Sequence, residues 1–372
     1  MSQHQLTASS PKPIATDLAQ AALTWKVVPI ASALVEVGVP QLIPLDGSSV
    51  DVAQLAQQAK VDADLLYRYM RYVSSLGIFK EQSNRHFAHN DSSKQLFPGH
   101  LTFYYLLVYG STKSGLLNAS TAYVTQLRDP SKAAIDHALK ISVWEHMTPE
   151  TEKHFADYMN LISCEVMPGI LEHIILPEIG IVADVGCGYG HVLLEFLKAN
   201  PKLTGIIYEL PTVTELAKKG LMSRDPQSDS IYAKYPIDVK QRVSVVAGDY
   251  TDVTQLKQIA NADVLFFKWI FHNNNDATCS KILAALYQIM KPTAKIVICD
   301  CVLKHTPNEY KLTIVLDLIM TEAVNGKQRT KEEWTQLLSD GDGYQYNVSF
   351  GEYSISRWEL DLITLTKKVI SS

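Results

Sequence analysis

Cysteine is scarce in this chain, and the few that occur have no spacing typical of a metal site or a disulfide framework. The 372 residues contain five cysteines, with no CxxC pair among them: Cys164, Cys187, Cys279, Cys299 and Cys301. Zinc sites and disulfide frameworks need paired or regularly spaced cysteines. We therefore expect no metal, no disulfide framework and a reducing compartment, the cytoplasm.

The chain also lacks an excess of positive charge and an apolar leader. Its formal net charge is −5, so the overall charge does not attract nucleic acid or an anionic membrane. The first residues, MSQHQLTASSPKP, are polar and contain no apolar run of the kind found in signal peptides or membrane spans. We expect a flexible arm over residues 1–15 and neither a nucleic-acid nor a membrane partner.

What the chain does contain is ordinary globular composition, 47% hydrophobic and 20% charged, over a length that allows two or three domains. From residue 181 onward, predicted strands alternate with predicted helices, which indicates an α/β protein with a doubly wound mixed sheet. Five strand segments are VADVG, TGIIYEL, RVSVVAGDY, ADVLFFKWI and AKIVICDCV. A long helix over 308–323, a helix that opens with a capping box at Thr330 and Glu333, and a terminal antiparallel pair complete residues 181–372.

Residues 16–100 read as a small helical domain whose segment GIFKEQSNRHFAHN forms a two-stranded wing, a winged helix. A DNA-binding regulator is one hypothesis for such a domain. However, the expected recognition helix over 64–76 offers only Arg68 and Arg71, and residues 1–100 carry equal numbers of basic and acidic residues. The charge pattern favours a module for packing or dimerisation.

Residues 101–180 are helical and rich in aromatic side chains, including Trp144 and Phe155. Such side chains either roof a substrate pocket or pack in a core, and helical spacing alone does not separate the two.

A glycine-rich turn follows the first strand of the sheet. Gly186, Gly188 and Gly190 lie between a buried strand and a helix, where glycine lets a ligand approach the backbone. The pattern from Asp184 is DxGxGxG rather than the GxGxxG of dinucleotide-binding proteins, and it matches the S-adenosylmethionine-binding loop of class I methyltransferases. Glu209, about 20 residues on, is placed to accept both ribose hydroxyls.

Other polar residues end the following strands, where ligands of open sheets bind. Asp249 can accept from the adenine amino group, and Tyr250 offers an aromatic face to the base. Lys268 can meet the methionine carboxylate. Each alone is equally well a turn residue or a solvated charge, but together they predict a cofactor site.

These motifs resemble the small-molecule O-methyltransferases of the caffeic acid and hydroxyindole type, known from plant and microbial natural-product pathways. The resemblance spans nearly the whole chain and rests on DVGCGYGH, YELPTV, AGDYTD, FKWIFHN and NGKQRTKEEW. It implies a homodimer, S-adenosylmethionine as methyl donor and a pocket roofed by residues 101–180. It also places Met159 at the substrate and Ser163 at the cofactor.

The same resemblance implies that His272 is the general base and that Asp300 and Gln328 orient it. A neutral imidazole with a pKa of about 6.5 can take the proton of a phenol, whose own pKa is about 10. The chain departs from the family pattern at Asn273 and Asn274, usually an acidic and an aromatic residue, and at Gln328, usually a glutamate.

Two enzyme hypotheses follow. The leading one is methylation of a small aromatic or enolic hydroxyl. Because a neutral Gln328 cannot stabilise an imidazolium, the alternative is a non-methylating S-adenosylmethionine-binding enzyme of the same fold, a hydroxylase, decarboxylase or pericyclase.

Overall fold

The computed structural model describes residues 25–83, 85–111, 113–223, 231–304 and 312–368, which divide into two compact units. The first unit contains the described residues up to Ser120 and Ile141–Leu161. The second contains Thr121–Lys140 and the described residues from Ile162 onward. Residues 101–180, expected as one helical block, therefore contribute to both units.

The first unit joins short helices to a small antiparallel sheet of order β1-β3-β2. Its elements up to residue 96 are α2 (Val27–Glu36), α3 (Val39–Leu42), β1 (Val50–Asp51), α4 (Val52–Ala59), α5 (Ala63–Ser75), β2 (Lys80–Ser83), β3 (His86–Ala88) and η1 (Ser93–Leu96). Asp51 and Asp62 cap α4 and α5 by accepting backbone N–H groups with their carboxylates. The antiparallel pair β2 and β3 lies where the sequence predicts a wing, and the winged-helix assignment stays a prediction.

The chain between residues 101 and 173 is helical, as expected. Its elements are α6 (Leu101–Tyr105), η2 (Leu106–Gly110), η3 (Leu116–Ala122), α7 (Tyr123–Arg128), α8 (Ala134–Leu139), α9 (Val143–His146) and α10 (Pro149–His173). The last of these, α10, supplies residues to both units.

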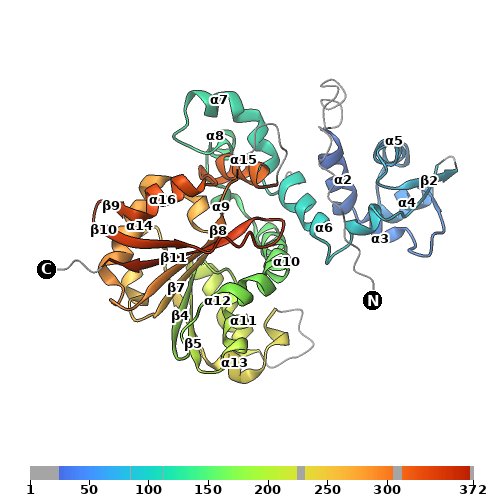
Figure 1. Cartoon of the computed structure of the whole chain (residues 1–372). Helices are drawn as coiled ribbons and strands as arrows, with labels where there is room; N and C mark the ends of the chain where they lie inside the picture. The colour runs from blue at the N-terminus through green and yellow to red at the C-terminus, as the bar shows by residue number, and fades with distance from the viewer. Residues whose placement is uncertain (1–24, 84, 112, 224–230, 305–311, 369–372) are drawn as a thin grey trace. The chain divides into compact units, whose positions relative to one another are not determined.

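The second unit is built on an eight-stranded mixed sheet of order β6-β5-β4-β7-β8-β11-β10-β9, seen in Figure 1. Its first five members are parallel and coincide with the five predicted strands: β4 (Gly180–Val185), β5 (Leu203–Glu209), β6 (Val243–Ala247), β7 (Val264–Lys268) and β8 (Lys295–Cys301). The antiparallel members are β9 (Asp340–Gly341), β10 (Tyr344–Phe350) and β11 (Leu360–Lys367). The predicted mixed sheet and its terminal pair are confirmed.

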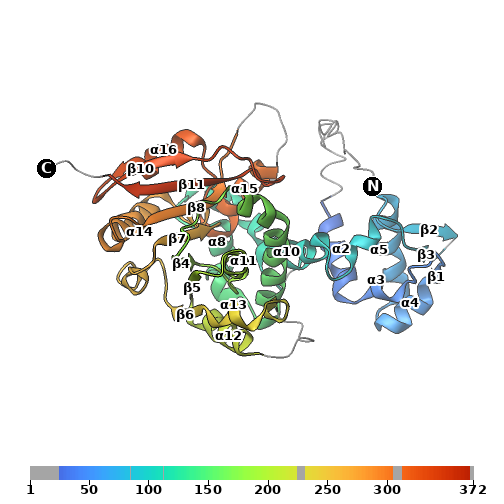
Figure 2. The same ribbon diagram turned by 60° about the horizontal axis from the view of Figure 1, so that its bottom comes forward.

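Helices pack on both faces of this sheet because its central strands are apolar on both faces. Phe266 of β7 packs edge to face on Phe196 of α11, whereas Phe267 on the opposite face joins the core that includes residues of α14 and α16. Figures 1 and 2 show α11, α12 and α13 beside β4–β6 and α14 and α16 beside β9 and β10. The helices of this unit are α11 (His191–Ala199), α12 (Pro211–Met222), η4 (Ile231–Lys234), α13 (Ile237–Gln241), η5 (Leu256–Ile259), η6 (Phe271–Asn273), α14 (Asp276–Ile289), α15 (Leu312–Val324) and α16 (Lys331–Ser339).

The strand order reverses at β4, which lies between β5 and β7. A crevice forms at such a point beyond the carboxyl ends of the strands, which is where ligands bind in doubly wound sheets. The predicted capping box is present, because Thr330 and Glu333 exchange side-chain to backbone hydrogen bonds at the start of α16. The predicted long helix is α15, and its expected first residues lie outside the described part of the chain. Among the described helices, none is both long and apolar enough to cross a membrane.

Candidate active site

The glycine loop lies at the carboxyl end of β4, directly before α11. All three glycines have positive φ, and Gly188, at +57°, is the most open of them. No atom lies within 4 Å of the place where a Cβ of Gly188 would stand, so a ligand can approach its backbone. The loop leads straight into the N-terminus of α11, whose free N–H groups favour a polar or anionic ligand group.

Glu209 lies beside this loop at the end of β5, as the sequence predicts. Its Oε1 accepts the Gly188 N–H at 3.2 Å, and its Oε2 accepts the Leu210 N–H at 2.5 Å. The carboxylate is therefore held in place next to the turn.

Asp184, which is buried in β4, and Lys268, which is half-buried at the end of β7, interact electrostatically. Burial raises the pKa of the Asp184 carboxyl to about 7, although the Lys268 ammonium opposes this shift. Burial likewise lowers the pKa of Lys268, an effect that Asp184 and Asp300 partly offset. The half-buried Lys268 thus provides, at this end of the sheet, a positive group that could bind a ligand carboxylate.

Asp249 and Tyr250 follow β6 but differ in how they are held. The Oδ1 of Asp249 accepts both the N–H and the hydroxyl of Thr251, so one carboxylate oxygen closes a turn. Burial raises the pKa of Tyr250 to about 12, and its hydroxyl shares a hydrogen bond with Asn274. Tyr250 is thereby connected to the segment that carries His272.

His272 is buried, 6% exposed, in the short helix η6 that follows β7. Its Nδ1 lies 3.3 Å from Oδ1 of Asp300, which is fully buried at the end of β8. The other oxygen of Asp300 accepts the backbone N–H of His272 at 3.2 Å. His272 is therefore a core residue and not a surface histidine.

Gln328 is the second polar neighbour of the imidazole. Its Nε2 lies 2.9 Å from Nδ1 of His272, and among the described residues its Oε1 has no hydrogen-bond partner. An ionised Asp300 only accepts hydrogen bonds, so Nδ1 must carry the proton that lies between them. Amide oxygen and nitrogen have nearly the same shape, and turning the amide lets its oxygen share this proton. The ring then presents an unprotonated Nε2.

Burial lowers the pKa of His272, and Asp300 only partly opposes that effect. The imidazole is therefore neutral at neutral pH and can accept a proton.

Arg329 is a site residue that the sequence reasoning missed, although it lies inside a quoted motif. It is fully buried, and its guanidinium donates to the carbonyl oxygens of Phe271 and Asn274 at 3.0 and 2.8 Å. The N–H of Lys327 donates to the carbonyl oxygen of His272 at 3.0 Å. The segment 326–329 therefore fixes the backbone on both sides of the imidazole.

The remaining predicted site residues lie on the helices before the sheet. Ser163 is buried on α10 and belongs to the second unit. Met159, Trp144 and Phe155 belong to the first unit, where Trp144 packs edge to face on Phe155. Their contacts with cofactor or substrate stay predictions.

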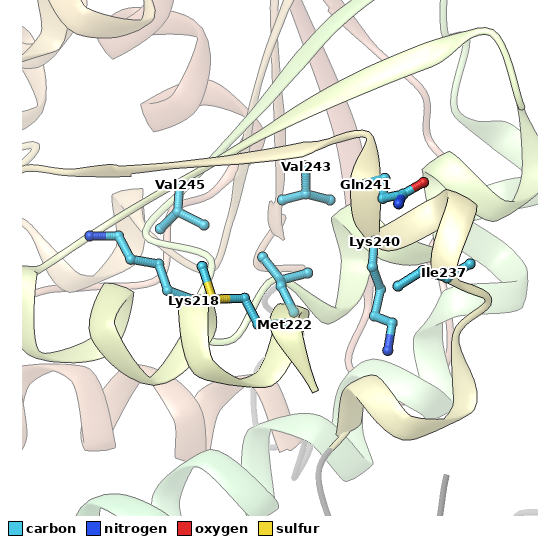
Figure 3. A pocket seen from close by; sticks show the side chains of 8 residues that line it. Lys218, Met222, Ile237, Lys240, Gln241, Val243 and Val245 are labelled. Atoms are coloured by element: carbon cyan, nitrogen blue, oxygen red, sulfur yellow. The ribbon is translucent and has the colours of Figure 1, made fainter. Parts of the chain in front are cut away.

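A separate hollow of about 520 Å³ opens at the outer edge of the sheet. Figure 3 shows Val243 and Val245 of β6 across from Lys218 and Met222 of α12, with Ile237, Lys240 and Gln241 beside them. None of the predicted site residues lines it, and it carries no ionisable pair suited to catalysis. The site at the carboxyl ends of the strands is therefore the better candidate.

The sheet order and the glycine loop at its switch point define a class I methyltransferase fold. Solved structures share this fold: mitomycin 7-O-methyltransferase MmcR has a TM-score of 0.79 at 21% identity, covering 94% of this chain and 97% of its own. NcsB1 from neocarzinostatin biosynthesis, in complex with S-adenosylmethionine and a hydroxynaphthoic acid, has a TM-score of 0.75 at 19% identity, with 93% and 98% covered.

Residues 122–345 match the O-methyltransferase domain family, and the chain belongs to that family. It is similar to (R,S)-reticuline 7-O-methyltransferase of Papaver somniferum, 27% identical over 338 residues that cover 84% of this chain and 87% of the relative. The predicted class of enzyme, an S-adenosylmethionine-dependent O-methyltransferase of natural-product type, is confirmed.

Proposed function

We propose that this enzyme methylates a hydroxyl of a small aromatic or enolic molecule and that His272 is its general base. The observation that carries the proposal is a neutral, buried imidazole at the end of β7, held by Asp300 at 3.3 Å. The opposite ring nitrogen is left to accept a proton.

The residues at the strand ends fit S-adenosylmethionine. The open backbone at Gly188 lies next to Glu209, which is placed to accept the ribose hydroxyls. Asp249 and Tyr250 would hold the adenine, and Lys268 would meet the methionine carboxylate. Asp184, Gly186, Gly190 and Ser163 complete the proposed cofactor site. When bound, this cofactor supplies the methyl group and takes the electron pair of the broken carbon–sulfur bond.

The chain's own part in the reaction is to hold the hydroxyl and remove its proton. Nε2 of His272 takes the proton as the hydroxyl oxygen bonds to the methyl carbon. Asp300 keeps the proton on Nδ1 and stabilises the imidazolium that forms, so Nε2 remains the accepting atom. The remaining requirement is alignment of the hydroxyl oxygen with the methyl group. Trp144, Phe155 and Met159 stay the predicted substrate contacts.

Gln328 narrows the class of substrate. A neutral amide can hold the imidazole by a hydrogen bond but gives the imidazolium little electrostatic stabilisation. The single carboxylate of Asp300 and a lowered pKa make His272 a weak base. We therefore expect substrates whose hydroxyl is more acidic than that of a simple phenol.

Transfer of a labelled methyl group tests the role of His272. His272→Ala is expected to lose almost all transfer, whereas His100→Ala, at an exposed histidine of the first unit, is expected to retain it. Undiminished transfer in His272→Ala would refute the role of the base.

The neutral Gln328 also keeps the non-methylating alternative open. Counting S-adenosylhomocysteine released per product separates the two reactions. One molecule per turnover supports methylation, and none supports the alternative.

We also propose that the chain forms a homodimer through its first unit, residues 16–100 acting as a dimerisation domain. Exposed apolar side chains of this unit, such as Leu65 and Leu76 on and next to α5, support the proposal. Light scattering at micromolar concentration tests it. A monomer mass would contradict the proposal.

A further inference from the structure

Unpaired buried polar atoms gather around His272. Among the described residues, five buried side-chain nitrogen or oxygen atoms have no hydrogen-bond partner. Two of them, in Ser74 and Asn160, belong to the first unit. The other three belong to the second unit, in Trp269, Gln328 and Trp358.

These three side chains form one contact chain through the imidazole. Gln328 contacts Nδ1 of His272 at 2.9 Å. The indole of Trp269 stacks nearly parallel to the imidazole, with ring centroids 6.2 Å apart, and Trp358 packs edge to face on Trp269 at 5.7 Å. Trp269 is 6% exposed and Trp358 is 3% exposed, so their indole N–H groups are not simply solvated. Native proteins rarely bury unpaired donors except where a ligand or a bound water accepts their hydrogen bond.

The backbone at Trp269 itself and on either side of Trp358 is held in an unfavourable conformation. Trp269 has φ +56°, and its backbone N–H, not its indole N–H, donates to the carbonyl oxygen of Cys299 at 3.0 Å. Trp358 lies between Ser356 at φ +59° and Glu359 at φ +48°. Left-handed conformations of residues other than glycine are costly and cluster at functional sites. Two strained segments thus bring two unpaired indoles into contact.

The unpaired donors are neutral. The guanidinium of Arg329, which lies next to the segment that carries the imidazole, is committed to Asp276 and to the carbonyl oxygens of Phe271 and Asn274. The Nζ of Lys268 lies over the face of the Trp269 ring, 4.2 Å from its centroid, and is assigned above to the cofactor carboxylate. Neutral donors suit a carbonyl oxygen better than a carboxylate or phosphate, which call for charged partners.

We propose that the indole N–H groups of Trp269 and Trp358 bind a carbonyl oxygen of the substrate. The substrate class is then a hydroxyl conjugated to a carbonyl: a hydroxyaryl ketone, a hydroxyquinone or the enol of a 1,3-dicarbonyl. The inference rests on the proposed function. A hydrogen-bonded carbonyl withdraws electrons from the conjugated hydroxyl and makes its proton easier to remove, which compensates for a weak base.

Two probes that differ only in the carbonyl test the kinetic consequence. 4-Acetyl-1-naphthol, whose carbonyl is conjugated to the hydroxyl but cannot bond to it internally, is expected to have the higher kcat/KM, and Trp358→Phe is expected to lower that value by about tenfold, the typical value of one hydrogen bond. The kcat/KM for 1-naphthol should change by less than about twofold in the same variant, because it offers this donor no carbonyl. Equal losses for both probes would overturn the proposal.

Indole ¹⁵N–¹H spectra of the wild-type protein, loaded with S-adenosylhomocysteine, give a readout that needs neither turnover nor a variant fold. 4-Acetyl-1-naphthol should shift the resonances of Trp269 and Trp358, and 1-naphthol should not. Trp334 is the internal reference, since its buried N–H already donates to Cys301 at 3.0 Å. No binding of the acetyl probe, or equal shifts with both probes, would overturn the proposal.

His272→Ala separates this inference from the proposed function. If the base is assigned correctly, this variant loses methyl transfer but keeps the indole shifts. Transfer that survives in this variant would refute the role of His272, while the indole shifts would still decide the carbonyl site.

Discussion

Asp300→Asn is the substitution that most sharply tests how the imidazole is held. Oδ1 of Asp300 lies 3.3 Å from Nδ1 of His272 and accepts the Cys301 N–H at 2.9 Å, while Oδ2 accepts the His272 N–H at 3.2 Å. Both oxygens therefore face donors. An asparagine in the same place must point its NH₂ group at one of these donors. If it faces the backbone N–H of His272, that hydrogen bond is lost; if it faces Nδ1, that nitrogen must become an acceptor.

The loss can be estimated from the distance. Two unit charges 3.3 Å apart in a medium of effective dielectric constant about 20 attract each other by about 5 kcal/mol. If about half of the imidazolium charge has developed in the transition state, the substitution removes about 2.5 kcal/mol, a factor of about 70 in rate. A forced change of tautomer would add to this loss.

The assay is kcat for methyl transfer together with the pH profile of kcat/KM. Asp300 raises the pKa of His272 against the effect of burial, so its removal should lower that pKa further. The imidazole then stays neutral to lower pH, so the acid limb of the kcat/KM profile should shift to lower pH. In the wild type the midpoint of this limb is expected below pH 6.5.

Asp263→Asn is the matched control. Asp263 precedes β7 at the opposite end of the sheet, where it pairs with Lys291 at 2.6 Å. This control is expected to leave the acid limb in place. A loss below about threefold in Asp300→Asn with an unmoved acid limb would refute the electrostatic account.

Four further predictions concern other residues of the second unit. Gln328→Glu should raise the pKa of His272, move the acid limb of kcat/KM to higher pH and speed transfer to weakly acidic phenols; an unchanged profile would contradict the contact at 2.9 Å. Arg329→Met should lower the free energy of unfolding by about 3 kcal/mol, because it leaves buried carbonyl groups unpaired, and urea denaturation would measure it. Gly188→Ala should weaken cofactor binding in calorimetry and cost about 1 kcal/mol of stability, because alanine is strained at φ +57°. Burial lowers the pKa of His191 to about 4, so the free energy of unfolding should fall by about 3 kcal/mol as pH drops from about 6.5 to 4, because protonation is then favoured in the unfolded chain. His191→Gln should flatten that dependence in urea denaturation, and an equally steep curve would contradict it.

Local patterns in the sequence predict the strands and the glycine loop well. An apolar strand, three glycines and an amphipathic helix follow one another within residues 180–199, so each signal is carried by neighbouring residues. The placement of Glu209 beside the loop also follows, because parallel strands end at the same edge of a sheet. The terminal antiparallel pair predicted for the end of the chain is formed by β10 and β11.

Contacts between distant segments were not predictable in the same way. Trp269 and Trp358 meet only because β11 pairs with β8, and that pairing depends on tertiary packing. The link between Tyr250 and Asn274 joins two loops for the same reason. The burial of His272 depends on the segment 326–329, which is distant in the sequence and packs over the backbone of His272. The boundaries of the helical block over 101–180 depend on which core each helix joins, and periodicity does not carry that information.

The most direct measurement of the central claim is a single turnover with ¹³C-methyl-labelled S-adenosylmethionine and 4-acetyl-1-naphthol. Wild-type enzyme is expected to give the O-methyl ether and one S-adenosylhomocysteine per product, and His272→Ala is expected to give almost none. Labelled ether formed equally fast by both proteins, or no transfer of the label by the wild type, would contradict it.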